Sequence, residues 1–355
     1  MKTAVLIMAG GHGERFWPRS RKNLPKQFLN ITDKEKTMIR LTVERILPLV
    51  NIEDVYILTN KDYFGLVKEQ LPDLPEANII CEPVSRNTAP CIGLGAMYVS
   101  KKDTDAVMFV LPSDHLIKNT EEFLKILKNA KEIAESGENL VTIGITPNYP
   151  ETGYGYIKYL KDMNNGSFSV DKFVEKPNID KAKEYLADGK YLWNSGMFIF
   201  TASTILKNME KFMPDTFNKL SKIKEVIGTE KEQEVLYEEF QKIEKQSIDY
   251  GIMEKASNIF TIPGSFGWDD VGSWVGLGRI NEKDENDNVL LGNTVTVNTN
   301  GCIICGNKRL IATLNVKDLV IVDTEDAILI SDKNSTNNIK EIINKVKESS
   351  GEKYL

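Results

Sequence analysis

The chain has 355 residues, 41% of them hydrophobic and 27% charged, a composition typical of a globular protein with a large core. Its formal net charge of -6 argues against a nucleic-acid partner, because a broad nucleic-acid surface needs an excess of lysine and arginine, although a few cations suffice to bind one nucleotide. The apolar start at residues 1–8 is too short for a signal peptide, and no later run approaches the roughly 20 apolar residues of a membrane helix, which predicts a cytoplasmic protein without a membrane partner.

Buried strands and amphipathic helices are expected to alternate in the first part of the chain. The predicted strands are 4–8, 55–59 and 106–111, and the predicted helices are 38–47, 64–70 and 121–135. Short apolar runs without polar alternation are typical of strands covered on both faces, so the pattern predicts an α/β fold with a doubly wound, mostly parallel, Rossmann-like sheet. Ligands of such sheets bind at the carboxyl ends of the strands.

The pattern becomes mixed from about residue 141 onward. Further strands are predicted at 141–145, 156–160, 170–175 and 197–201, with a helix at 202–213. A polar, acidic linker at 281–288 precedes a valine- and isoleucine-rich segment with frequent Asn, Gly and Asp, and a terminal helix is predicted at 339–347. We therefore expect a large α/β domain over residues 1–282 and a small C-terminal β-rich domain over residues 288–355. Edge strands of the small domain are candidates for pairing with a second copy of the chain in a homodimer.

Cys302 and Cys305 form a CxxC pair, a spacing also found in zinc and redox sites. They lie in a β-like run, in which residues three apart point to opposite faces, and the histidines His12 and His115 are distant in the chain. We therefore expect both cysteines to be structural and without a disulfide.

A glycine-rich loop directly follows the first predicted strand. It consists of Ala9, Gly10, Gly11, His12 and Gly13. Glycines let the backbone approach a ligand, and their N–H groups can bind phosphates, although a simple tight turn is the alternative. The loop is no Walker A motif, and Phe16 replaces the third glycine of the dinucleotide fingerprint, which argues against a dehydrogenase. The nearby cations Arg15 and Lys26 favour binding of a triphosphate, whose charge they could offset as pyrophosphate leaves.

Acidic residues follow other predicted strands. Asp114 comes after the strand at 106–111, where a magnesium ligand for phosphates is expected, although a helix cap is the alternative. The other ligand candidate lies in the string at 266–274, which carries the neighbouring acids Asp269 and Asp270. The polar string at 81–90 precedes a helical pattern, so capping by Asn87 or Thr88 is one interpretation of that string.

Three later strings carry groups suited to a sugar phosphate. They contain Gly153, Tyr154 and Gly155, then Glu175 and Lys176, then Asn194. Glycines permit close approach, a carboxylate and an amide can bind hydroxyls, and a lysine can bind phosphate. Taken singly, each string is more typical of a turn or an exposed pair.

The glycine loop with Arg15, followed by Pro25-Lys26, matches a GGxGxR…PK signature, and over residues 1–279 the chain resembles the sugar-phosphate nucleotidyltransferase family. Residues 82–90 match the string EPxxRNTAP of that family's mannose-specific guanylyltransferases. The resemblance implies transfer of GMP from GTP to mannose 1-phosphate, which yields GDP-mannose and pyrophosphate, with Mg²⁺ as cofactor. Some relatives carry a further cupin-type isomerase domain, for which this chain is too short, so we expect a single activity.

The resemblance also implies a role for each matching residue. Arg15 and Lys26 would be catalytic cations, and Asp114 and Asp270 would bind the metal, the latter through a WxDxG pattern. Nucleotide binding is implied for Ala9, Gly10, Gly11, Gly13, Glu82, Arg86, Asn87 and Thr88. Sugar-phosphate binding is implied for Gly153, Tyr154, Gly155, Glu175, Lys176 and Asn194. Asp249 is a candidate for supporting the site without a direct role.

Two other functions stay open. The first is a transferase for another pair, such as glucose 1-phosphate with UTP or dTTP. The second is a non-catalytic nucleotide-sugar sensor, in which we would expect the cations and acids to be lost, whereas here they are present. The transfer would need no catalytic His, Cys or Ser, because the attacking phosphate oxygen is already an anion.

Overall fold

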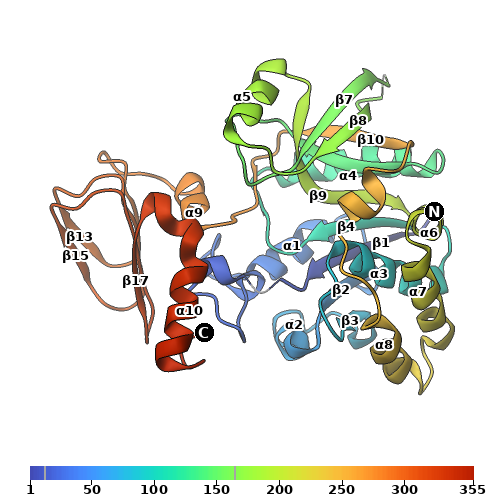
Figure 1. Ribbon diagram of the computed structural model, residues 1–355, viewed down its shortest axis with the longest axis horizontal. Helices are drawn as coiled ribbons and strands as arrows, with labels where there is room; N and C mark the ends of the chain where they lie inside the picture. Colours follow the sequence, from blue (N-terminus) through green and yellow to red (C-terminus); the bar gives the residue numbers. More distant parts are fainter. Residues whose placement is uncertain (12, 164) are drawn as a thin grey trace. The chain divides into compact units, whose positions relative to one another are not determined.

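The structure, a computed structural model, describes residues 1–11, 13–163 and 165–355 (Figure 1). The chain forms two compact units. The first consists of Met1–Gly10, Val43–Ser113 and Ile117–Trp268, and the second consists of Gly11–Thr42, Asp114–Leu116 and Asp269–Leu355. The segment after the glycine loop therefore belongs with the C-terminal part of the chain. The domain boundary expected between residues 282 and 288 stays a prediction.

The first unit is built on a nine-stranded sheet with the order β3-β2-β1-β4-β9-β6-β10-β8-β7. The strands are β1 (Thr3–Ala9), β2 (Val55–Asn60), β3 (Ile79–Glu82), β4 (Val107–Pro112), β6 (Leu140–Ile145), β7 (Tyr156–Asp162), β8 (Phe168–Val174), β9 (Tyr191–Thr201) and β10 (Ile259–Gly264). Strands β1 to β4 are parallel, as are β6 and β10, which confirms the predicted Rossmann-like α/β fold. Strand β9 lies antiparallel between β4 and β6.

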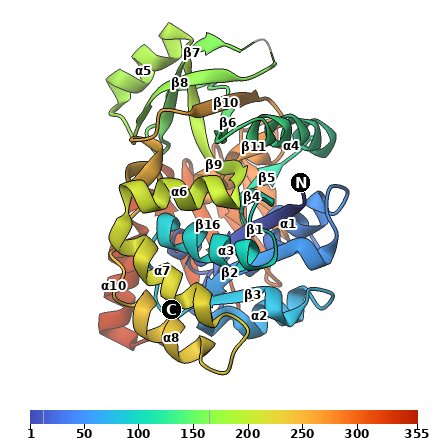
Figure 2. The ribbon, with the colours of Figure 1, turned by 90° about the vertical axis from the view of Figure 1, so that its right-hand side faces the viewer.

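Helices pack against this sheet or against one another. They are α2 (Phe64–Gln70), α3 (Thr88–Lys102), α4 (Thr120–Glu135), α5 (Ile179–Asp188), α6 (Ala202–Phe212), α7 (Pro214–Val226) and α8 (Glu232–Phe240), while α1 (Met38–Ile46) spans the division between the units. Helices α3, α6 and α7 pack against one another over the sheet (Figure 2). Successive residues of β1, from Ala4 to Ile7, are all buried, as expected for a strand covered on both faces.

The C-terminal part of the second unit is a coil of short strands. Strands β12 (Val289–Leu291), β14 (Ile303–Cys305) and β16 (Leu319–Asp323) stack in parallel, and β17 (Ile328–Asp332) pairs antiparallel with β16. Strands β13 (Thr294–Val297) and β15 (Ile311–Leu314) form a second parallel pair. Short strands β5 (Leu116–Ile117) and β11 (Trp268–Asp269) and helices α9 (Trp274–Ile280) and α10 (Ile339–Ser350) lie elsewhere in the chain. The predicted β-rich character of the C-terminal region is thus confirmed, and its extent as a domain over residues 288–355 stays a prediction.

The two cysteines of the CxxC pair face different sides of this coil. Cys302 packs with Ile304 and Ile321, whereas Cys305 packs in the larger cluster with Phe16 and Trp274. Both thiols are buried and free, and burial raises the pKa of Cys305 to about 12. Buried thiols are unreactive, which agrees with a structural role for both cysteines.

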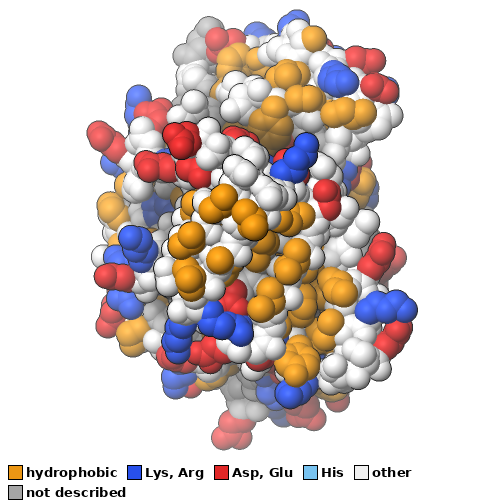
Figure 3. Space-filling model, turned by 90° about the vertical axis from the view of Figure 1, so that its left-hand side faces the viewer, with side chains coloured by type: hydrophobic (Ala, Val, Ile, Leu, Met, Phe, Trp, Pro, Cys, Tyr) orange, Lys and Arg blue, Asp and Glu red, His pale blue; other side chains and the backbone are white. Residues whose placement is uncertain are grey.

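Apolar side chains also gather on the outer side of the coil (Figure 3). Val295, Val297 and Leu314 project from β13 and β15, and each is more than half exposed. The homodimer expected from the edge strands stays a prediction. In the part of the chain that the structure describes, no helix is long and apolar enough to cross a lipid bilayer.

Candidate active site

The two halves of the glycine signature pack directly on each other in the second unit. Gly13 has a φ of 61°, in the left-handed region, and a Cβ atom there would lie 2.6 Å from the backbone nitrogen of Lys26. A side chain at this position would be strained and would also displace Lys26. The Nε2 atom of Gln27 donates a hydrogen bond of 2.9 Å to the Gly11 carbonyl. His12 of the same loop lies outside the described residues.

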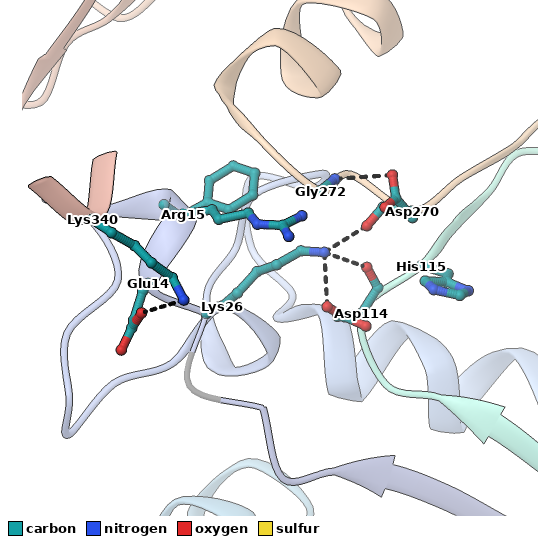
Figure 4. Close-up of a pocket in the computed structure, with 10 residues that line it drawn as sticks. Glu14, Arg15, Lys26, Asp114, His115, Asp270, Gly272 and Lys340 are labelled. Atoms are coloured by element: carbon teal, nitrogen blue, oxygen red, sulfur yellow. Dashed lines mark hydrogen bonds and ion pairs between the residues drawn. The ribbon is translucent and has the colours of Figure 1, made fainter. Parts of the chain in front are cut away.

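The Lys26 side chain connects three segments that are distant in the sequence. It is only 6% exposed, and its ammonium donates to Asp114 Oδ2 at 2.8 Å, to the Asp114 carbonyl at 3.0 Å and to the Asp270 carbonyl at 2.6 Å (Figure 4). A buried ammonium with three oxygen partners is held in place as a fixed positive charge. Lys26 therefore fixes the positions of both acidic segments.

The two metal-ligand candidates differ from their acidic neighbour Asp269. Burial alone would raise the pKa of Asp114, but the charges of Lys26 and His115 and the hydrogen bond from Lys26 hold it below its ordinary value. The Asp270 Oδ1 atom accepts a hydrogen bond of 3.1 Å from the Gly272 N–H. Asp269, in contrast, is paired with Arg279 at 3.1 Å and accepts from the Val271 N–H at 2.7 Å. Asp269 thus has a structural role, whereas the metal-ligand candidates Asp114 and Asp270 line the pocket.

Arg15, Lys26, Asp114 and Asp270 line one open pocket of about 440 Å³ within the second unit (Figure 4). Arg15 is exposed, and its guanidinium has no hydrogen-bond or ion-pair partner among the described residues. The other lining residues are Gly13, Glu14, Phe16, His115, Gly272 and Lys340. The structure thus brings together the four residues predicted to act on the phosphates. Glu14 and Lys340 were not among the site residues predicted from the sequence.

In the described part of the chain, the metal-ligand candidates Asp114 and Asp270 belong to no larger cluster of possible metal ligands. Within the described ranges, no group of three or more His, Cys, Asp or Glu side chains is arranged to hold a metal ion. Magnesium bound to phosphates commonly needs only one or two carboxylates, since phosphate oxygens and water supply its other ligands. The oxygen donors of Asp114 and Asp270 therefore fit a phosphate-bound divalent ion.

Glu82 and Gly10 are neighbours in the first unit. A Cβ atom on Gly10 would lie 3.4 Å from Glu82 Oε2, and the Glu82 side chain is buried at the end of β3. Its Oε1 atom has no hydrogen-bond partner among the residues that the structure describes. Burial raises the pKa of Glu82 to about 8, although a hydrogen bond with Cys91 acts in the opposite direction. A buried carboxyl oxygen without a partner can bind a ligand that brings donors.

Three further residues of the string at 81–90, namely Arg86, Asn87 and Thr88, hold the chain around the start of α3. The Asn87 Oδ1 atom caps the helix by accepting a hydrogen bond of 2.7 Å from the Thr88 N–H, so the capping interpretation holds for Asn87. The Thr88 hydroxyl accepts from the Ile248 N–H at 2.9 Å, and the Arg86 guanidinium donates to the carbonyl of Gln241. A role of these three residues in base recognition stays a prediction.

Several of the predicted sugar-phosphate residues also cluster in the first unit. A Cβ atom on Gly155 would lie 3.1 Å from Glu175 Oε2 and 3.6 Å from the Asn194 Cβ, and Glu175 forms an ion pair with Lys176. The Asn194 Nδ2 atom donates a hydrogen bond of 2.7 Å to Asp249 Oδ1. Burial raises the pKa of Asp249, and the hydrogen bond from Asn194 opposes this effect. Asp249 thus orients the Asn194 amide.

The remaining two residues of this set are held by aromatic and polar contacts. The Tyr154 ring packs edge-on against Trp193 and Trp268, with centroid distances of 5.3 Å and 5.2 Å. The Gly153 N–H donates a hydrogen bond of 2.8 Å to Glu151 Oε1. These contacts fix the turn that carries Gly155.

Two family models match consecutive parts of the chain. The model described as nucleotidyl transferase matches residues 4–287, and the model described as MannoseP isomerase/GMP-like beta-helix domain matches residues 292–346. The second match agrees with the coil of parallel strands described above.

Individual relatives match over nearly the whole chain. A mannose-1-phosphate guanylyltransferase of Salmonella montevideo is 40% identical over 351 residues, which are 96% of this chain and 73% of the relative. A mannose-1-phosphate guanylyltransferase of Escherichia coli is 38% identical over 355 residues, which are 98% of this chain and 74% of the relative. A crystal structure from Thermus thermophilus, described as a mannose-1-phosphate geranyltransferase, has a TM-score of 0.89 at 34% identity and covers 98% of this chain and 100% of its own.

These matches confirm the resemblance predicted from the motifs. Nucleotidyl transferases of this kind generally use a divalent metal ion. The chain belongs to the nucleotidyl transferase family and, within it, to the mannose-1-phosphate guanylyltransferases.

Proposed function

We propose that the chain transfers GMP from GTP to α-D-mannose 1-phosphate and so produces GDP-mannose and pyrophosphate. The observation that carries the proposal is the pocket in which Arg15, Lys26, Asp114 and Asp270 converge. Two cations beside two carboxylates suit a reaction in which phosphorylated molecules meet. The choice of guanine and mannose follows the relatives that are named for these substrates.

The reaction is an in-line attack on the α-phosphorus of GTP. A phosphate oxygen of mannose 1-phosphate forms the new O–P bond, and the bond from the α-phosphorus to the β-phosphate oxygen breaks, so the electron pair leaves with pyrophosphate. Because the nucleophile is already an anion, the protein must only orient the reactants and offset their charge. Lys26 acts as a fixed charge that needs no reorganisation, and exposed Arg15 can bind phosphate oxygens bidentately.

Asp114 and Asp270 would hold the metal ion, and Mg²⁺ is the ion that best fits a pair of carboxylates completed by phosphate oxygens. Bound there, Mg²⁺ would offset negative charge on the phosphates. The depressed pKa of Asp114 keeps this carboxylate ionised at neutral pH, as a metal ligand requires.

Residues of the first unit would recognise the base and the sugar. Glu82 would accept hydrogen bonds from N1 and N2 of guanine, with the ligand supplying the donors that its buried Oε1 atom lacks. Glu175 and Asn194 would bind hydroxyls of mannose, and Lys176 would bind the phosphate of mannose 1-phosphate.

A substrate panel tests the proposal. The purified chain is incubated with Mg²⁺ and each combination of GTP, UTP, dTTP or ATP with mannose 1-phosphate or glucose 1-phosphate, and pyrophosphate release is measured. We expect the highest kcat/KM for GTP with mannose 1-phosphate. A higher value for another pair would refute the assigned specificity, and no release from any pair, together with tight GDP-mannose binding, would support a sensor instead.

A further inference from the structure

A third cationic side chain lines the phosphate pocket, and it comes from the C-terminal helix. Lys340 is the second residue of α10 and lies beside Glu14 and Arg15 in the pocket (Figure 4). Its side chain is 73% exposed, and its ammonium is 3.7 Å from Glu14 Oε2. At this distance the two groups form an ion pair, but the separation is too long for a good hydrogen bond.

Stability does not account for a lysine at this position. An exposed ion pair of this kind contributes about 0–1 kcal/mol. A positive charge in the first turn of a helix is also disfavoured by the helix dipole. The other paired lysines of α10, Lys345 and Lys347, lie in its second half, where the dipole favours them, and they pair with Glu348 and Glu352. Lys340 thus differs from them in its position on the helix and in the pocket that it lines.

The charges of the pocket indicate what Lys340 can bind. The Lys26 ammonium is already occupied by Asp114 and the Asp270 carbonyl, so Arg15 and Lys340 are the pocket cations that stay exposed to an incoming anion. GTP carries several negative charges on its β- and γ-phosphates, and an ammonium is a suitable partner for them.

We propose that Lys340 binds the β- and γ-phosphates of GTP, and the pyrophosphate that they become, and that Glu14 holds Lys340 at the pocket before the phosphates arrive. This inference rests on the proposed function. It gives the C-terminal coil and its helix a direct part in substrate binding. In this proposal Lys340 does not contact mannose 1-phosphate.

Three variants test the role of Lys340. Lys340→Ala removes the charge, Lys340→Arg keeps it, and Lys345→Ala removes an equally exposed charge from the same helix outside the pocket. KM is measured for GTP and mannose 1-phosphate in the forward reaction and for pyrophosphate in the reverse reaction. We expect K340A to raise KM for GTP and for pyrophosphate about tenfold, with KM for mannose 1-phosphate within about twofold of wild type. We expect K345A to resemble wild type and K340R to restore most of the binding that K340A loses.

A result in which K340A changes KM for GTP and pyrophosphate no more than K345A does would overturn the inference. If the wild-type chain shows no turnover at all, the proposed function fails, and calorimetric titration with inorganic pyrophosphate then judges Lys340 by itself. Weaker pyrophosphate binding by K340A than by K345A would still support the contact, and equal binding would refute it. Glu14→Gln should weaken pyrophosphate binding, because Lys340 is then no longer held at the pocket, and unchanged or stronger binding would contradict the role of Glu14.

Discussion

Replacing Glu82 by glutamine removes an ionisable carboxyl group that is buried in the folded protein. Glu82 is 5% exposed, and its Oε1 atom has no hydrogen-bond partner among the described residues. Burial raises its pKa from 4.5 to about 8 against the weaker effect of the hydrogen bond with Cys91. The folded protein therefore keeps this proton at pH values at which the unfolded chain has released it.

The sign of the effect on stability follows from the raised pKa. The contribution of Glu82 to the free energy of unfolding is fully present below pH 4.5 and is lost as the pH rises to about 8, where the folded state ionises too. Across that interval the loss amounts to about 4–5 kcal/mol. Glutamine does not titrate, so between pH 5 and pH 8 the wild type should lose about 3 kcal/mol relative to E82Q.

Urea unfolding followed by tryptophan fluorescence at pH 5, 6.5 and 8 measures this difference. Glu69→Gln, which changes an exposed carboxylate on α2, is the matched control and should follow the wild-type pH dependence. A constant difference between wild type and E82Q from pH 5 to pH 8 would show that Glu82 is not held protonated. Because the guanine donors favour the ionised carboxylate, KM for GTP should also fall as the pH rises towards 8 in wild type and not in E82Q.

Other substitutions separate the roles of the remaining groups. Lys26→Ala and Asp270→Ala should each lower kcat more than about a hundredfold with an unchanged circular dichroism spectrum, and normal turnover in both would contradict their assigned roles. Gly13→Ala should lower both the melting temperature and kcat, because its Cβ atom would meet the Lys26 backbone at 2.6 Å; an unchanged melting temperature would argue against this packing. Asp249→Ala should raise KM for mannose 1-phosphate and leave KM for GTP unchanged, since the Asn194 amide loses its partner, and a change confined to GTP would contradict that assignment. Removal of divalent ions with EDTA should abolish pyrophosphate release, and added Mg²⁺ should restore it; turnover that persists in EDTA would exclude the metal role.

The sequence predicts the parallel part of the sheet well because its strands are continuous apolar runs. The expected strands at 4–8, 55–59 and 106–111 appear as β1, β2 and β4, and none of their ends differs from the prediction by more than one residue. Strand β9 was predicted only from residue 197, whereas it begins at Tyr191. The polar Asn194 and Ser195 interrupt its apolar pattern, and a strand buried on both faces carries no sign of its direction, so its antiparallel pairing could not be predicted.

The residues that line the pocket around Lys26 were predictable where a motif or a strand end marked them. Arg15 and Lys26 flank a glycine loop, and Asp114 follows β4 directly. Lys340, in contrast, is one lysine among several on an amphipathic helix, and no sequence motif assigns it to the pocket. Its place in the pocket depends on long-range packing that a single sequence does not reveal.

The packing of the segment after the glycine loop also limits where the chain can be truncated. The first family model ends at residue 287 and the second begins at residue 292. The apolar core of the second unit nevertheless contains residues from both regions, since Phe16 and Trp17 are buried together with Val320 and Leu329. The Trp17 indole N–H also donates a hydrogen bond of 2.7 Å to the carbonyl of Tyr354. A truncation after residue 287 would remove the apolar partners of Phe16 and Trp17, so residues 11–42 should fold properly only together with the C-terminal coil.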